Sequence, residues 1–149
     1  MYPHLQYGIT TWGNASKTLL TKIFIKQKCV VKTICYQKLQ TNSNPLFKKL
    51  RMLKLEDIVK LHISKLMFKM QQQTLVGDNR LTKVSSIHNY NTRTSTSSNY
   101  FIHRRRTNLG CRSFTVVGPK ILTNVPKEIK ELNFKQFKNP LKKHLFNKY

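Results

Sequence analysis

The imbalance between cationic and anionic side chains is the feature that most limits how this sequence can fold. Lysine and arginine total 28 residues, aspartate and glutamate total 5, and the formal net charge is +23. A compact chain with so few carboxylates repels itself unless an external anion neutralises it. Because only 39% of the residues are hydrophobic, the sequence predicts a modest core and a strongly cationic surface.

A phosphate backbone is the most common partner of such a surface, so we predict contact with RNA or DNA. An anionic membrane surface and an ordinary solvated lysine-rich surface are the alternatives. Most of the cations are lysines, which suit sequence-independent phosphate contact, whereas arginine offers a planar fork that matches phosphate geometry. The arginines concentrate in one stretch: Arg93, Arg104, Arg105, Arg106 and Arg112.

The spacing of apolar residues predicts a mostly α fold, a small helical domain of three or four helices with a long polar loop and one short strand pair. The clearest helix runs from Leu55 to about Gln73, where Glu56 and Asp57 suit the positive end of the helix dipole. A second helix is expected from an N-cap at Asn14 or Ser16 to about residue 39. A shorter one should follow Pro45.

The C-terminal part carries mixed signals. Residues 113–117 are predicted to form a short strand, and Gly118 with Pro119 a turn. A brief helix is expected after Pro126, and a last helix after a cap at Asn133, kinked or delayed by Pro140. We expect one basic, mainly helical unit over residues 1–149, divided into a helical half (1–73), a polar arginine-rich connection (74–112) and a C-terminal turn with helices (113–149).

The residues that catalysis or a tight site requires are sparse. Cys29, Cys35 and Cys111 form no close pair, and the five histidines lack ligand spacing, so neither a disulfide framework nor a metal site is expected. There is no phosphate-cradling glycine-rich loop and no nucleophile elbow. We therefore predict a chain that is not an enzyme by itself, with no cofactor and no small-molecule substrate. Without a membrane span or signal peptide, we expect it inside the cell, in the nucleus or cytoplasm.

Several motifs occur together and in order. They are YPHLQYGITTWGN at the start, NPLFKKLRMLKLEDIVKLHISKLMFKM in the middle, HNYNTR and RRRTNLGCRSFTVVGPK in the polar part, and VPKEIK with FKQFKNPLKKHL at the end. In this combination the sequence resembles the C-terminal region of reverse transcriptases from jockey-like non-LTR retrotransposons, the LINE class of mobile elements. The resemblance covers essentially the whole chain.

The resemblance implies the thumb end and the segment after the palm of an RNA-directed DNA polymerase. The resemblance implies that the palm and its catalytic aspartates lie upstream. Asp57 and Asp78 are the only aspartates of this sequence, and neither stands in the context of the family's catalytic motif. The chain would then be a non-catalytic fragment that contacts template or primer beside an upstream palm domain. Two departures stand out: leucine replaces the family's tryptophan at Leu122, and Leu75-Val76-Gly77 replaces a Leu-Pro pair.

The candidate binding residues are arginines for phosphate and aromatic residues that can stack on unpaired bases. They are Arg93, Arg104, Arg105, Arg106, Arg112, Tyr90, Tyr100 and Phe101. The competing interpretations are a solvated loop, a free-standing basic RNA-binding protein such as an organellar ribosomal component, and a retroelement remnant without function.

Overall fold

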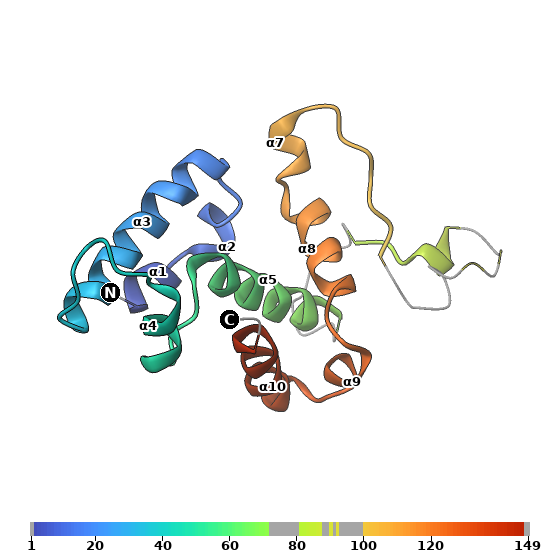
Figure 1. The fold of residues 1–149 in the computed structure, drawn as a ribbon. Helices are drawn as coiled ribbons and strands as arrows, with labels where there is room; N and C mark the ends of the chain where they lie inside the picture. The colour runs from blue at the N-terminus through green and yellow to red at the C-terminus, as the bar shows by residue number, and fades with distance from the viewer. Residues whose placement is uncertain (1, 72–80, 88–89, 91, 93–99, 148–149) are drawn as a thin grey trace. The chain divides into compact units, whose positions relative to one another are not determined.

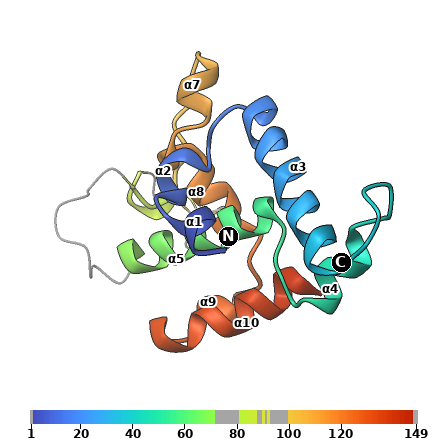
Figure 2. The same cartoon turned by 90° about the vertical axis from the view of Figure 1, so that its left-hand side faces the viewer.

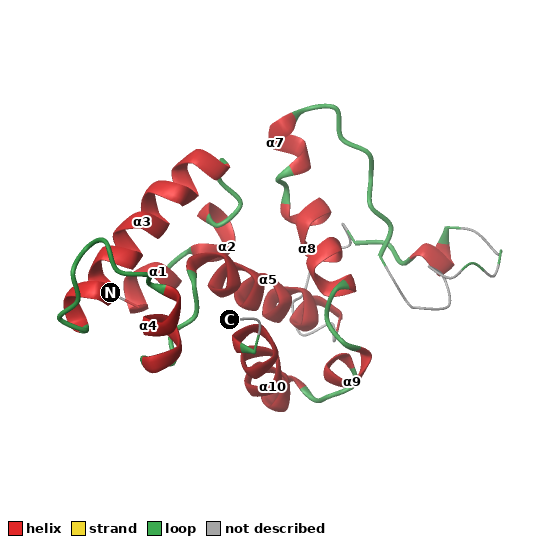
Figure 3. Cartoon of the chain, in the orientation of Figure 1, coloured by secondary structure: helices red, strands yellow, loops and turns green. Residues whose placement is uncertain are grey.

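A computed structural model of the chain describes residues 2–71, 81–87, 90, 92 and 100–147 (Figure 1). These residues are mostly helical, which confirms the predicted fold class (Figure 3). The four longer helices are α3 (Lys17–Ile34), α5 (Leu55–Gln71), α8 (Phe114–Thr123) and α10 (Phe134–Phe146). The shorter elements are α1 (Tyr2–Gln6), α2 (Ile9–Trp12), α4 (Asn44–Lys49), the 3-10 helix η1 (Val84–Ser86), α7 (Asn108–Cys111) and α9 (Lys127–Lys130).

The described chain divides into two compact units. Unit 1 comprises Met1–His62 and Lys138–Tyr149, and unit 2 comprises Ile63–Phe137. Each unit therefore contains part of α5 and part of α10. The predicted division at residues 73 and 112 stays a prediction.

In unit 1 the core forms where α3 and α4 lie side by side (Figure 2). Val31, Leu46 and Phe47 are buried there, and the Phe47 ring stacks on Phe24 at 6.3 Å between centroids. The apolar side of α3 is only partly covered, because Ile34 remains 51% exposed. The centre of the face is instead a polar side chain: Gln27 is fully buried.

Helix α3 begins at the expected place and ends earlier than expected. Ser16 accepts a hydrogen bond from the N–H of Leu19, as an N-cap should. The helix stops at Ile34 because Tyr36 adopts a left-handed conformation with φ 52°. The N–H of Tyr36 then bonds to the carbonyl of Thr33, and the N–H of Gln37 to the carbonyl of Lys32. This pair of bonds is the Schellman arrangement, usually built with glycine at the left-handed position.

The first residues of unit 1 form two helical turns. These are the short helices α1 and α2, with Gly8 between them at φ 57°. Trp12 donates from its indole nitrogen to the carbonyl of Tyr7 at 2.7 Å. Gly13 allows close packing, because a Cβ there would lie 3.0 Å from both methyl groups of Val59.

In unit 2 the predicted strand at residues 113–117 and the turn at residues 118–119 are both wrong. These residues are the start and the middle of α8, whose first turn is closed by bonds from Val116 and Val117 to the carbonyl of Ser113. The physical reason lies in packing. A Cβ on Gly118 would be 2.6 Å from Sδ of Met67, so this glycine permits close approach of α8 to α5. No strand occurs in the part of the chain that the structure describes.

The helices near the C-terminus follow the prediction more closely. Helix α9 follows Pro126, and α10 starts after Asn133 without delay, although Pro140 lies inside it. The start of α10 is fixed by aromatic packing within unit 2. The ring of Phe68 stacks on Phe137 at 4.3 Å and on Phe134 at 6.3 Å.

Candidate nucleic-acid interface

The candidate interface is the run from Tyr100 to Arg112 in unit 2, called the arginine segment below. Its first residues are fixed to the backbone of another stretch. Lys83 and Tyr100 form an isolated antiparallel bridge, and the N–H of Phe101 donates to the carbonyl of Thr82 at 2.8 Å. Tyr100 is half-buried, and this burial raises the pKa of its phenol above the ordinary value. The backbone at the start of the segment is therefore fixed by its pairing with Thr82 and Lys83.

An aromatic pair follows directly. The ring of Phe101 is 37% exposed and meets the imidazole of His103 edge-on, with centroids 4.9 Å apart and an interplanar angle of 88°. Residues two apart in extended chain project to the same side, which explains the contact. An exposed phenylalanine face held by a neighbouring ring offers an unpaired base a surface on which to stack.

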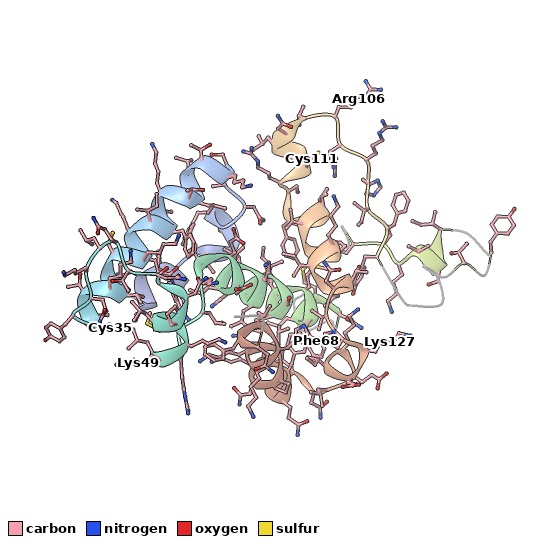
Figure 4. The ribbon with its side chains drawn as sticks, viewed as in Figure 1. Cys35, Lys49, Phe68, Arg106, Cys111 and Lys127 are labelled. Carbon is pink, nitrogen blue, oxygen red and sulfur yellow. The ribbon has the colours of Figure 1, made fainter. Side chains whose placement is uncertain are left out.

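Four cations follow this pair along the chain. The side chains of Arg104, Arg105, Arg106 and Arg112 are all exposed. Figure 4 shows Arg106 on the stretch that leads into α7. Among the residues that the structure describes, no carboxylate forms an ion pair with any of these four guanidinium groups. Their hydrogen-bond donors are available to an anionic ligand.

The end of the segment is shaped by α7. Thr107 caps this helix, because its hydroxyl oxygen accepts from the N–H of Gly110 at 3.1 Å. The thiol of Cys111 donates back to the carbonyl of Arg105 at 3.6 Å. A Cβ on Gly110 would lie 3.1 Å from the Cβ of Arg105, so the small residue allows this close return. The backbone of Arg105 is thereby tied to α7 while its side chain stays exposed.

The two remaining predicted site residues, Tyr90 and Arg93, lie outside the arginine segment. Tyr90 is described and 79% exposed, whereas Arg93 lies outside the described residues. Tyr100, Phe101 and the four later arginines lie on one continuous segment of the chain. Their role in binding stays a prediction.

Sequence reasoning missed three members of the neighbourhood. Lys83 enters through the bridge to Tyr100, which no local pattern announces. His103 could have been found from its alternation with Phe101. Thr107 could have been found as a Thr-x-x-Gly cap before a turn of helix.

Unit 1 carries its own exposed cations, which form a natural comparison set. They are Lys17, Lys22, Lys26, Lys38, Lys48, Lys49, Arg51, Lys138, Lys142 and Lys143. Lys32 differs from these because its ammonium donates to the carbonyl of Leu39. Lys28 differs too, with its ammonium 4.5 Å from the centre of the Phe24 ring.

No group of three or more His, Cys, Asp or Glu side chains that could hold a metal ion occurs within the described parts of the chain. Nor does any helix there have the length and apolarity needed to cross a bilayer.

Comparison with known proteins adds no relative. No family model matches the sequence, and no curated protein or solved structure matches it significantly. The resemblance to a retrotransposon polymerase therefore rests on the motifs alone.

Proposed function

We propose that this chain is a non-catalytic nucleic-acid-binding protein that contacts the phosphate backbone of RNA or DNA through the arginine segment. The observation that carries the proposal is the run of three consecutive exposed arginines without carboxylate partners among the described residues. In a chain of net charge +23, the planar guanidinium groups of these arginines are suited to bidentate phosphate contact. Phe101 adds a surface for an unpaired base, which favours a single strand over a duplex.

The motif resemblance gives this proposal a biological setting. A segment similar to the C-terminal region of a retrotransposon reverse transcriptase would serve to hold template or primer while an upstream palm domain performs the chemistry. The four described carboxylates support a non-catalytic role: Glu56 and Asp57 lie in the first turn of α5, and Glu128 and Glu131 lie in and beside α9.

The test is the binding of a fluorescently labelled single-stranded RNA, followed by anisotropy at several salt concentrations. If six to ten phosphates of the single strand are contacted, affinity should fall by about 300-fold to about 10⁴-fold between roughly 50 and 200 mM salt. An affinity that does not change with salt would exclude electrostatic contact with phosphate.

Two triple variants of equal charge locate the interface. Arg104→Ala, Arg105→Ala and Arg106→Ala remove three cations of the arginine segment, and Lys22→Ala, Lys26→Ala and Lys49→Ala remove three exposed cations of unit 1. We expect the arginine variant to lose far more affinity, with a salt slope shallower by up to about 2, since each single-strand phosphate contributes roughly 0.7. Equal losses would mean that binding depends on total charge and that the arginine segment has no special role.

A further inference from the structure

We propose that Thr107 is a phosphorylation site for an arginine-directed protein kinase, and that the added phosphate turns off the arginine segment. The first half of this proposal concerns the chemistry of Thr107 itself. The second half rests on the nucleic-acid binding proposed above.

The position of Thr107 suits recognition by an acidic substrate groove. Arg104, Arg105 and Arg106 occupy the three positions before it, and Thr107 has the only hydroxyl in the sequence preceded by three arginines. Kinases choose substrates partly through such charge patterns. A kinase with carboxylates lining the subsites before the acceptor would find three exposed guanidinium groups there, none of which pairs with a carboxylate of the described residues.

The local backbone suits entry into such a groove. The residues from Phe101 to Arg105 form no regular helix or strand, and Thr107 is exposed with an extended backbone at φ −100° and ψ 148°. The helix that follows, α7, has four residues, and a helix of that length is unstable in isolation. Its opening to admit the kinase therefore requires the loss of few contacts, such as the bond from Gly110 to the Thr107 hydroxyl.

The reaction uses ATP as the second substrate. The Thr107 hydroxyl oxygen forms a bond to the γ-phosphorus as the bond between that phosphorus and the bridging oxygen breaks. The hydroxyl proton passes to the catalytic aspartate of the kinase, and ADP leaves with its magnesium ion. The product is a phosphothreonine with a charge of about −1.5 to −2.

The phosphate would act where the proposed ligand acts. It would stand next to Arg106 and within reach of its neighbours, where it could form charge-assisted hydrogen bonds with the same guanidinium groups. Those groups would then be occupied from within the chain, and a nucleic-acid phosphate would meet a negative charge. The formal charge of the segment would fall from +4, carried by its four arginines, to about +2.

The experiment begins with modification of the full chain by an arginine-directed kinase and ATP, with sites mapped by mass spectrometry. We expect Thr107 as the main site. The initial rate of Thr107 phosphorylation should be lower by about tenfold or more in the double variant Arg104→Ala, Arg105→Ala. Desolvated charge pairs across an interface commonly contribute at least that much to binding. Thr107→Val keeps the shape of the side chain and should abolish this modification alone.

The second arm compares single-stranded RNA binding by the phosphorylated and unmodified proteins. We expect about tenfold weaker binding after phosphorylation, the scale of losing one or two charge-assisted contacts, and no change in kinase-treated Thr107→Val. Modification elsewhere with Thr107 untouched, or a rate that ignores the arginines, would overturn the assignment of the site. Phosphorylation of Thr107 with unchanged RNA affinity would overturn the switch. If the unmodified chain binds no RNA, the proposed function fails while the site assignment is judged by mass spectrometry alone.

Discussion

The backbone N–H of Leu55 donates a 2.9 Å hydrogen bond to Oε1 of Gln27, a side chain buried in the middle of α3. The side-chain amide of Gln27 also donates a hydrogen bond, from Nε2 to the carbonyl of Leu53 at 3.0 Å. One glutamine therefore satisfies the first free N–H of α5 and a carbonyl of the chain that leads into it. Helix starts leave such groups without intrahelical partners, so Gln27 solves this problem from another helix.

Replacing Gln27 by methionine should be strongly destabilising. The change keeps the volume but leaves two buried backbone groups unpaired, at a cost of about 1–3 kcal/mol each. We expect the midpoint of urea unfolding to fall accordingly. Gln37→Met is the control, since Gln37 is exposed and should shift stability by no more than about 0.5 kcal/mol. Equal midpoints for the two variants would contradict the structural role of Gln27.

Gly118→Ala should destabilise unit 2. The new Cβ would meet Sδ of Met67 at 2.6 Å and Cγ at 3.1 Å, and Met67 is fully buried. Overpacking of this kind costs about 1–3 kcal/mol. A double-mutant cycle with Met67→Ala provides the control, because the cost of Gly118→Ala should largely vanish once the thioether is gone. Additive free energies of unfolding would show that the two residues do not meet.

Tyr36→Gly should stabilise the protein. Tyr36 is 96% exposed and has φ 52°, so its ring contributes little packing while its Cβ crowds the backbone. Relief of that crowding is worth about 1 kcal/mol in the free energy of unfolding. Tyr36→Ala removes the ring but keeps a Cβ, and we expect it to stay near the wild type. A gain of the same size for alanine would assign the effect to the ring.

Phe101→Ala should weaken binding to single-stranded RNA more than binding to a duplex of the same sequence. Loss of one stacked base costs about 1–3 kcal/mol, whereas bases inside a duplex are not available to stack. Phe101→Trp keeps an aromatic face and should preserve the preference. Equal losses on both RNAs in anisotropy titrations would indicate that Phe101 has no contact with bases.

The sequence was most informative where apolar spacing and capping agreed. Helix α5 was predicted from its i, i+3, i+4 pattern with Glu56 and Asp57 in the first turn. Helix α3 was predicted from a cap at Asn14 or Ser16, and the structure has the cap at Ser16. Helix α8 was missed because its β-branched run and its Gly-Pro pair both favour other structures locally. The helix forms instead where Gly118 packs closely against Met67, which is distant in the sequence. Tertiary packing of this kind has no local signal.

The candidate interface was only partly predictable, because some of its features depend on contacts between residues that are apart in the sequence. The arginine run is visible in the sequence, and its exposure follows from its charge. The anchoring of Tyr100 to Lys83 and the return of Cys111 to Arg105 depend on backbone positions that no spacing rule supplies. Gln27 was invisible as well, because a glutamine in a helix reads as a solvent-facing residue until its partners are known.

Unit 1 is built from two separate stretches of the chain, and this determines when it can be completed during synthesis. This unit joins residues 1–62 with residues 138–149, while unit 2 is a single uninterrupted stretch. On a ribosome, all of unit 2 emerges before the last piece of unit 1 does. Unit 1 therefore becomes complete only after residues 138–149 have been synthesised. A stop codon at residue 138 would spare every residue of unit 2 and still leave unit 1 unfinished.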